Sequence, residues 1–289
     1  MNKTKLYTMI KLQSSFSVII AVYNNVQTLQ RCIDSFASQN HENKELIIID
    51  GKSIDGTVDI IRNNHTNITY WESEPDRGIY HAFNKGVSHA TGEWIIFLGS
   101  DDYFCNSDVL SNVAEKLALN SNSVRLVYGR VAMVSAKGEV LQIMNKSWEK
   151  SKYNFLQFCN INHQGVFHHY SLFKEKGLFD ESFKLAGDYE LLLRELKDHD
   201  AYFLDDDIIT YMQIGGVSTS PENYLKVYKE YDRARIKNGV KILPLVLGWL
   251  FFIACVRLMI TKIVGNNISN KITDFYRKLT FRTKLWTKF

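Results

Sequence analysis

Four short apolar runs, each followed by a polar turn, fall within the first third of the chain. The runs cover residues 16–23, 45–50, 68–71 and 93–98, and the stretches 26–39, 56–63 and 79–90 carry apolar residues at helical spacing. A run that is apolar at nearly every position is typical of a parallel strand buried on both faces. The alternation of strands and helices predicts right-handed βαβ units and a mainly parallel sheet.

The pattern changes after residue 105. We expect helices over 106–120, 171–177, 188–198 and 221–238, and strands over 125–129, 201–204 and 208–213, with a hairpin over 131–144 that turns at Lys137-Gly138. No internal repeat or low-complexity linker interrupts this series. The sequence therefore predicts an α/β domain in residues 1–218 and a helical region in residues 219–289.

Composition fits a globular protein, and the charge is unevenly distributed. The 289 residues are 45% hydrophobic and 23% charged, which excludes wholesale disorder, collagen and simple coiled coil. Residues 1–240 carry 26 basic and 30 acidic side chains, whereas residues 241–289 carry nine basic and one acidic. Four widely spaced cysteines favour a reducing compartment over a disulfide framework. Residues 1–13 are polar and basic, and no signal peptide is expected.

Acidic residues stand where the predicted parallel strands end. Asp50 closes the second run, Asp76 follows the third, and Asp101-Asp102 follows the fourth. Ligands bind outside the carboxyl ends of strands in open α/β sheets, so these acids predict a site for hydroxyls and a hard cation. Ligands that are all oxygen favour Mg²⁺ or Mn²⁺. Each acid also has an ordinary interpretation, because Asp50 suits a turn and Asp55 suits a helix N-cap.

The order of five segments carries a resemblance to a known family. They are FSVIIAVYNN, LIIIDGKSIDGT, EPDRGIYHAFNKG, GEWIIFLGSDD and NHQGVFHHYSLFKEKGLFDESFKLAGDYELLLR. Together they resemble family 2 glycosyltransferases with the GT-A fold, of the type that builds bacterial capsule, O-antigen or exopolysaccharide. The resemblance covers roughly residues 15–215 and implies a Rossmann-like nucleotide-binding sheet with flanking helices.

The resemblance also implies roles for individual residues. The set expected to bind a nucleotide sugar, most often a UDP-sugar, is Ala21, Val22, Tyr23, Asp50, Ser53, Asp55, Asp76, Arg77, Asn84, Lys85, Ser100 and Asp101. Asp102 matches the metal ligand of the DxD motif, with Mn²⁺ or Mg²⁺ as cofactor, although Ser100 replaces the first acid of that motif. His163 and Gln164 match positions near the acceptor or diphosphate. Asp188 matches the catalytic base.

The implied reaction is displacement at the anomeric carbon of a sugar, with inversion. A carboxylate opposite the diphosphate takes the proton of the acceptor hydroxyl, and Asp188 suits this role. The dipole of the helix near its start would lower the pKa of Asp188, whereas burial would raise it. Glu190 is a fallback base, two residues further along the helix, where it would face away from Asp188. The cluster of His163, His168 and His169 fits core or solvated histidines better than a zinc site.

Two other functions stay open. A polyprenyl-phosphate sugar transferase would use a lipid phosphate as acceptor and would not need Asp188 as a base. The second is a membrane-bound scaffold that has lost catalytic turnover. The replacement of an acid by Ser100 slightly favours this hypothesis, whereas the presence of Asp102 and Asp188 argues against it. The QxxRW signature of processive synthases is absent, which favours transfer of one sugar to each acceptor.

The basic tail contains an apolar segment. Residues 242–256 hold no charge, and 15 helical residues span about 22 Å, less than the roughly 30 Å of a bilayer core. Basic residues on both sides disfavour a crossing orientation. We expect a peripheral or monotopic anchor on the cytoplasmic face of the inner (plasma) membrane, a lipid-linked saccharide as acceptor, and no nucleic-acid partner. A buried helix with a solvated basic tail is the alternative.

Overall fold

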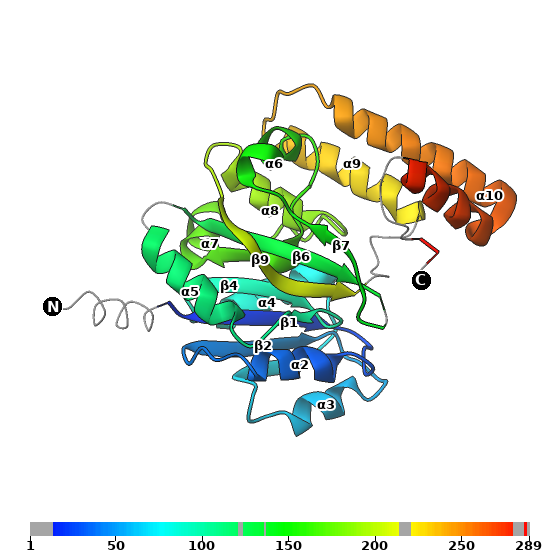
Figure 1. The fold of residues 1–289 in the computed structure, drawn as a ribbon. Coiled ribbons are helices and arrows are strands. Elements are labelled where there is room, and N and C mark those ends of the chain that lie inside the picture. Colours follow the sequence, from blue (N-terminus) through cyan, green and yellow to red (C-terminus); the bar gives the residue numbers. More distant parts are fainter. Residues whose placement is uncertain (1–13, 121–123, 136, 214–220, 280–285, 288–289) are drawn as a thin grey trace.

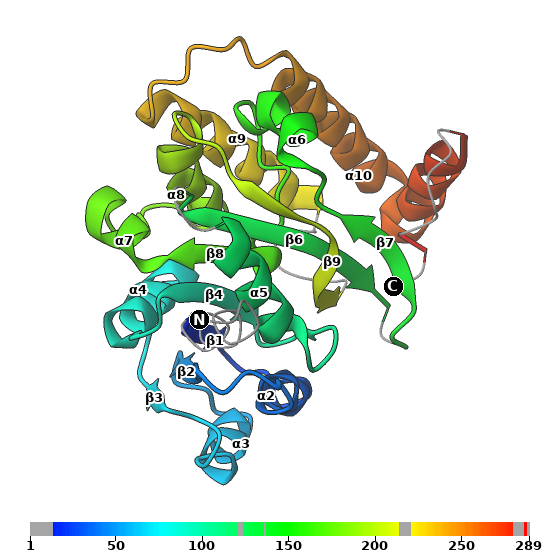
Figure 2. The same ribbon diagram turned by 60° about the vertical axis from the view of Figure 1, so that its left-hand side comes forward.

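The computed structural model of this chain describes residues 14–120, 124–135, 137–213, 221–279 and 286–287. In these residues nine strands form one sheet in the order β3-β2-β1-β4-β8-β6-β9-β5, with β7 paired to β6 (Figures 1 and 2). The strands are β1 (Phe16–Val22), β2 (Lys44–Asp50), β3 (Tyr70–Ser73), β4 (Trp94–Gly99), β5 (Tyr103–Phe104), β6 (Leu126–Val134), β7 (Val140–Met144), β8 (Val166–His169) and β9 (Tyr202–Gln213).

The predicted parallel strands form one half of a mixed sheet. β1 pairs in parallel with β2 and with β4, and β2 pairs in parallel with β3. β8 then lies antiparallel between β4 and β6, and β6 is parallel to β9. In this register Ala21 of β1 lies opposite Gly99 of β4, and Val22 lies opposite Asp50 of β2. The carboxyl ends of these three strands therefore meet at one edge.

Helices cover both faces of the sheet, which explains why the strands are apolar at successive positions. Val18 and Ile20 point into a core shared with α2 (Leu29–Ala37), α3 (Thr57–Asn63) and α5 (Val109–Asn120). Ile19 and Phe97 point into the opposite core, with α4 (Ile79–His89), α6 (Trp148–Phe155), α7 (Tyr170–Lys176) and α8 (Gly187–Leu196). Successive side chains of a strand alternate between faces, so each face needs its own apolar set.

Several element boundaries differ from those predicted. Helix α2 begins at Leu29 rather than near residue 26, because Asn25 and Thr28 bond to the loops at neighbouring strand ends. The two short strands predicted over 201–213 are one strand, β9, which continues through Asp205 at a φ of 52°. Strands β5 and β8, helix α6 and a 3₁₀ turn at His163–Gly165 were not predicted. These short elements have no periodicity of their own to reveal them.

Two helices follow the sheet. Helix α9 (Pro221–Lys237) packs against α8, and α10 (Leu245–Leu279) packs against α9 (Figure 1). Gly265, at a φ of 78°, divides α10 into a first arm, residues 245–264, and a second arm, residues 266–279. Polar bonds hold the arms together, since Thr261 Oγ1 lies 2.7 Å from Ser269 Oγ and Arg257 donates to Asn270 Oδ1. The tail is therefore a helical hairpin.

The contact of α4 with β1 depends on a glycine. A Cβ atom at Gly86 would lie 2.5 Å from Cγ2 of Ile19, which is fully buried. We expect Gly86→Ala to lower the free energy of unfolding by about 1–2 kcal/mol, because overpacking outweighs the gain in helix propensity. Urea unfolding measures the change. Gly248→Ala is the matched control, because no atom lies within 4 Å of a Cβ added at that helical glycine. Equal stability of the two variants would contradict the tight packing.

Candidate active site

A cleft of about 500 Å³ opens at the carboxyl ends of β1 and β2. Its lining residues are Ala21, Val22, Tyr23, Gly51, Pro75, Asp76, Gly78, Ile79 and Ala82. The sequence expectation for a nucleotide sugar named four of these residues, Ala21, Val22, Tyr23 and Asp76. Because the N-terminal turn of α4 forms one wall, the cleft joins strand ends to a helix N-terminus, an arrangement that suits a phosphorylated ligand.

Asp50 is fully buried beside the cleft and holds the loop that follows β2. Its carboxylate accepts bonds from Ser53 N at 2.9 Å, Ser53 Oγ at 2.5 Å and Ser73 Oγ at 2.5 Å. Ser53 Oγ in turn accepts the backbone N–H of Asn24 at 2.7 Å. Asp50 and Ser53 thereby fix the positions of Gly51 and Tyr23, which line the cleft.

Asp55 is exposed and ties two loops together. Its carboxylate accepts from Val26 N, from Thr57 N and from Thr57 Oγ1. The bond from the Thr57 hydroxyl, with the two backbone bonds, lowers the pKa of Asp55. The N-cap residue of α3 is Gly56, at a φ of 100°, so Asp55 is not the N-cap that the sequence suggested. It stands one residue earlier and accepts the N–H of Thr57, the first residue of the helix.

A network of charges forms the side of the cleft near α4. Asp76 Oδ1 lies 2.8 Å from His81 Nδ1 and 3.2 Å from Lys85 Nζ, and Lys85 also pairs with Glu72 at 2.5 Å. Burial works against the charge of Lys85, but the two carboxylates outweigh it and raise the pKa of this lysine. Asp76 and Lys85 are thus joined in one network, with Asp76 at the cleft surface.

Arg77 and Asn84 both contact the segment that leads to α8. Arg77 donates twice to Glu181 Oε2, at 3.0 and 2.7 Å. Asn84 bonds to both backbone groups of Phe179, donating to its oxygen at 3.0 Å and accepting from its nitrogen at 2.9 Å. In this structure the two side chains therefore link α4 and the residues just before it to residues 179–181.

Two adjacent carboxylates follow β4. Asp102 is 2% exposed and accepts from Gly99 N and from Gln213 N. Burial, and then the neighbouring Asp101, raise the pKa of Asp102 to about 8, and burial also raises the pKa of Asp101. A Cβ at Gly99 would lie 2.7 Å from Asp102 Oδ2. The turn therefore requires glycine and places two carboxyl groups side by side, and no cation of the described residues is paired with either.

Ser100 joins this turn to the first strand. Its Oγ accepts from Asn25 Nδ2 at 2.7 Å, and its carbonyl accepts from Thr28 Oγ1 at 2.9 Å. The residue that departs from the family motif therefore serves as an anchor between two loops. Among the described residues, no group of three or more His, Cys, Asp or Glu side chains could hold a metal ion.

His163 and His168 lie in an aromatic core behind the carboxylates. Their ring centroids are 5.0 Å apart, and the ring of His163 stacks on Phe97 at 5.2 Å. Burial lowers the pKa of both rings, that of His168 to about 4, so both are neutral near pH 7. The backbone oxygen of the adjacent Gln164 accepts from Thr210 Oγ1, and its side chain acts to lower the pKa of Asp102.

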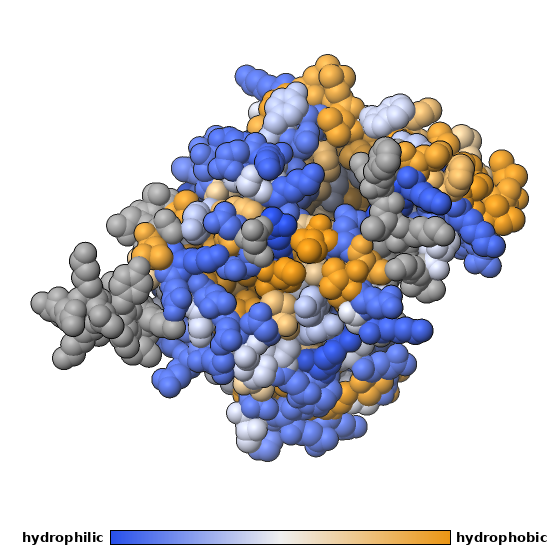
Figure 3. Space-filling model, viewed as in Figure 1, coloured by the Kyte–Doolittle hydropathy of each residue, from blue (hydrophilic) through white to orange (hydrophobic). Residues whose placement is uncertain are grey.

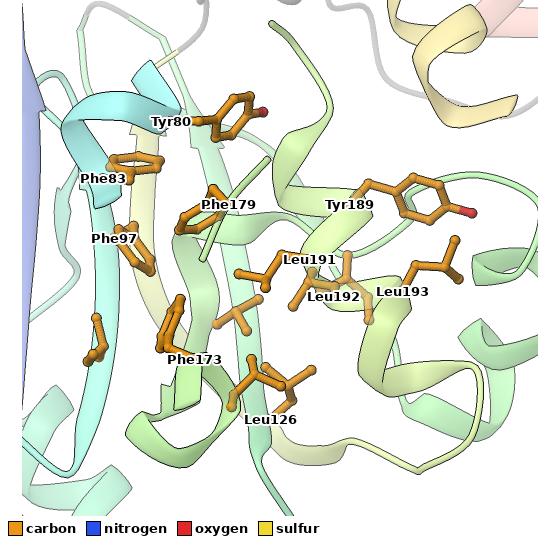
Figure 4. Close-up of a cluster of buried hydrophobic side chains, with 14 of the residues drawn as sticks. Tyr80, Phe83, Phe97, Leu126, Phe173, Phe179, Tyr189, Leu191, Leu192 and Leu193 are labelled. Atoms are coloured by element: carbon orange, nitrogen blue, oxygen red, sulfur yellow. The ribbon is translucent and has the colours of Figure 1, made fainter. Parts of the chain in front are cut away.

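Asp188 lies in the first turn of α8, next to Tyr80. Its Oδ1 accepts from Tyr80 OH at 3.3 Å and from Tyr189 N at 2.8 Å. The Tyr80 ring stacks on Phe179, 5.5 Å between centroids, beside Phe83 and Phe97 (Figure 4). Burial raises the pKa of Asp188 to about 6, although its hydrogen bonds oppose the shift. Burial therefore outweighs any effect of the helix dipole.

Glu190 occupies a different environment from Asp188. Burial opposes its charge, but Arg194 and Lys237 lower its pKa, and its carboxylate is fully buried between these cations. Sequence reasoning missed the contact of Tyr80 with Asp188, and it missed Glu230 of α9, which bonds to the loop before α8. Only the tertiary fold brings these residues together.

The comparisons with known proteins agree with this geometry. The family model described as "Glycosyl transferase family 2" matches residues 17–179. A "PGL/p-HBAD biosynthesis glycosyltransferase" of Mycobacterium tuberculosis H37Rv is 30% identical over 210 residues, which is 71% of this chain and 79% of the relative. The fold is GT-A, and the chain belongs to glycosyltransferase family 2.

Solved structures share the fold at low sequence identity. Staphylococcus aureus TarS 1–349 in complex with UDP-GlcNAc gives a TM-score of 0.61 at 19% identity, over 82% of this chain and 70% of that one. The mannosyltransferase PcManGT of Pyrobaculum calidifontis, in complex with GDP-Man and Mn²⁺, gives 0.58 at 15% identity, over 96% and 88%. The likeness extends the assignment of the fold to nearly the whole chain.

The raised pKa of Asp188 has a consequence for stability. The pKa of Asp188 in the folded state lies above the ordinary aspartate value, so folding disfavours the ionised form of this carboxyl. The wild type therefore loses stability as the pH rises from about 4 through about 6. We expect Asp188→Asn to melt at a higher temperature than the wild type at pH 7.5, and the difference to shrink towards pH 4. Scanning fluorimetry across this pH range measures it. A difference that is constant with pH would show that Asp188 titrates normally.

Proposed function

We propose that this glycosyltransferase moves one sugar, with inversion, from a nucleotide sugar to a hydroxyl group of a lipid-linked saccharide in the synthesis of a surface polysaccharide. The observation that carries the proposal is the position of Asp188. This partly shielded carboxylate contacts Tyr80 on α4, the helix whose first turn lines the cleft. A base with a pKa near 6 is ionised at neutral pH and still holds a proton well.

The donor is proposed to lie in the cleft at the ends of β1 and β2. UDP is the favoured nucleotide because TarS binds UDP-GlcNAc, although PcManGT binds GDP-Man. Tyr23 is 67% exposed at the cleft wall and offers its ring to a base, while Asp76 faces the same space. Asp50, Ser53, Asp55, Asn84 and Lys85 support these walls through the bonds described above.

A divalent cation, Mn²⁺ or Mg²⁺, fits the turn after β4. Asp102 would hold it and Asp101 would contact the ribose or sugar, because two crowded carboxylates without a bonded cation favour a positive charge. Since Asp102 is the one side chain proposed to hold the ion, oxygen atoms of the diphosphate would supply further ligands. When bound, the ion stabilises the charge that develops on the leaving diphosphate.

The remaining chemistry belongs to side chains. Asp188 accepts the proton of the acceptor hydroxyl as that oxygen attacks the anomeric carbon and the bond to the diphosphate breaks. Tyr80 donates to Asp188 Oδ1 and so orients the carboxylate. His163, which is neutral, and the adjacent Gln164, whose side chain lowers the pKa of Asp102, are proposed to act on the acceptor or diphosphate side.

Turnover tests the assignment of Asp188. With UDP-Glc, UDP-Gal, UDP-GlcNAc, UDP-GalNAc and GDP-Man as donors, a membrane lipid extract as acceptor and Mn²⁺ present, we expect Asp188→Asn to lower kcat at least about 100-fold. The KM for the donor should stay within about twofold. Wild-type kcat/KM should rise with pH and level off above about pH 6, because the base must lose its proton. Asp59→Asn, at an exposed acid of α3, is the control and should act as wild type.

Two results would contradict the proposal. Full turnover of Asp188→Asn would favour the polyprenyl-phosphate sugar transferase, whose acceptor already carries a charged oxygen. Absence of turnover with every donor, together with no nucleotide binding in a thermal-shift assay with Mn²⁺, would favour the inactive scaffold.

The division of the chain fits a membrane-associated enzyme. We propose a catalytic unit in residues 1–218 and an anchoring region in residues 219–289, on the cytoplasmic face of the membrane. Helix α10 is long and apolar enough to cross a membrane, and only 11% of its most apolar window is buried within the protein. Apolar side chains gather over α10 on the surface (Figure 3). Because the two arms of α10 form a hairpin, we favour a position in the membrane–water interface over a helix that crosses the bilayer.

The second arm of α10 carries the features of an interfacial helix. Ile268, Ile272, Phe275 and Leu279 are 44–63% exposed, at spacings of four, three and four residues that form one helical stripe. Lys271, Arg277 and Lys278 lie on the same arm. Such a stripe flanked by cations favours an anionic lipid surface, where a lipid-linked acceptor would also be found.

Vesicle binding tests this anchor. We expect the chain to sediment with vesicles of phosphatidylethanolamine and phosphatidylglycerol, and 0.5 M KCl to weaken the binding. The double substitution Ile272→Glu with Phe275→Glu should lower the bound fraction at least about tenfold. Burial of each of these apolar side chains in the lipid surface contributes about 1.5–3 kcal/mol to the free energy of binding, and the substitution removes it. Leu119→Glu, at an exposed leucine of α5, should bind as wild type. Equal binding by all three proteins would exclude the second arm as the anchor.

A further inference from the structure

Glu230, on α9, accepts three consecutive backbone N–H groups. Its Oε1 accepts from Lys184 N at 2.8 Å, and its Oε2 accepts from Leu185 N at 2.9 Å and from Ala186 N at 2.8 Å. Ala186 is the N-cap residue of α8 and has no side-chain oxygen to bond there. The acceptor for this stretch of backbone therefore comes from another helix.

The same face of α9 holds the rest of this loop. Arg233 donates to Ser182 Oγ at 2.8 Å and lies over the Phe183 ring at 3.6 Å, and Lys237 pairs with Asp180 at 2.7 Å. Positions 230, 233 and 237 lie on one helix face, since they are three and four residues apart. Residues 180–186 are thus held along α9 by charged side chains.

The other side of the loop contacts the donor half of the fold. Asn84 bonds to Phe179, and Arg77 pairs with Glu181. The loop leads directly to Asp188, the second residue of α8. Its path between α4 and α9 determines where this carboxylate stands relative to the cleft.

We propose that Glu230 is a positioning residue, which sets the placement of Asp188 by fixing the three backbone groups that precede it. The inference rests on the proposed role of Asp188 as base. Charge-assisted bonds from a carboxylate to backbone N–H groups are among the stronger hydrogen bonds in proteins. Without them, the backbone at residues 184–186 would have to find water or move.

Glu230 also contributes to the proton affinity of Asp188. Burial is the main cause of the raised pKa of Asp188, and the charge of Glu230 adds to it in the same direction. The other titratable groups that interact with Asp188 are Tyr80 from α4, Cys159 from the segment after α6, and Tyr231 from α9. Burial raises the pKa of all three above the ordinary value, so they stay neutral at pH 5–8. Glu230 is thus the charged neighbour whose removal shifts the titration.

Two measurements that need no substrate test the proposal. In hydrogen exchange, Glu230→Ala should lower the protection of the amides of residues 184–186 at least about tenfold, the effect of losing one hydrogen bond. Melting temperatures are measured for the wild type and for Asp188→Asn from pH 4 to 8. The difference between the two proteins, plotted against pH, reports the titration of Asp188. This curve should move to lower pH when Glu230→Gln is present in both proteins.

Asp232→Asn is the matched control. It removes a carboxylate from the same helix, which pairs with Arg235 and makes no bond to residues 184–186. It should leave both the exchange and the titration curve at wild-type values. Unchanged exchange and an unchanged titration in the Glu230 variants would overturn the proposal, even if those variants were less stable.

Turnover separates this inference from the proposed function. We expect Glu230→Gln to lower kcat about tenfold with little change in donor KM, and to extend activity to lower pH. A fully active Asp188→Asn would refute Asp188 as base, whatever Glu230 does. An inactive Asp188→Asn beside Glu230 variants with wild-type kcat and pH profile would leave the proposed function standing and refute the positioning role alone.

Discussion

Burial of both faces of β1, β2 and β4 is the constraint on which the rest of the structure depends. Helices pack on both sides of these strands, so polar groups collect at the ends, where the chain leaves the sheet. The loops there satisfy one another, as when Asn25 bonds to Ser100 and Val26 bonds to Asp55. A ligand site at this edge is therefore built on loops that are already fixed by mutual hydrogen bonds.

Four acids of the candidate site and its surroundings fall into two electrostatic groups. Asp55 and Glu190 have lowered pKa values, because hydrogen-bond donors or cations reach their carboxylates. Asp102 and Asp188 have raised pKa values, because burial dominates and no cation in the described part of the chain is paired with them. The first group stabilises the fold. Carboxylates of the second group are held in a costly state, which is typical of residues that meet a metal, a proton or a substrate.

Much of this arrangement could be predicted from the sequence, and the failures have physical causes. The period of apolar residues located β1, β2, α4 and β4 to within about two residues, and the end of each strand located the acids. Short elements such as β5 and β8 escaped, since two or four residues carry no measurable period. The contact between Glu230 and Ala186 also escaped, because 44 residues separate them and Glu230 lies outside the five segments that carry the family resemblance.

That separation has a consequence for the order of synthesis. Residues 184–186 leave the ribosome well before Glu230, so the loop before Asp188 has no acceptor for its backbone until α9 has emerged. The chain that follows α9 directly is the apolar α10. The newly made protein therefore completes the hydrogen bonds of the backbone before Asp188 only as the apolar helix α10 begins to appear. One stretch of chain in this way sets the time at which the loop before Asp188 is fixed and the time at which the apolar segment emerges.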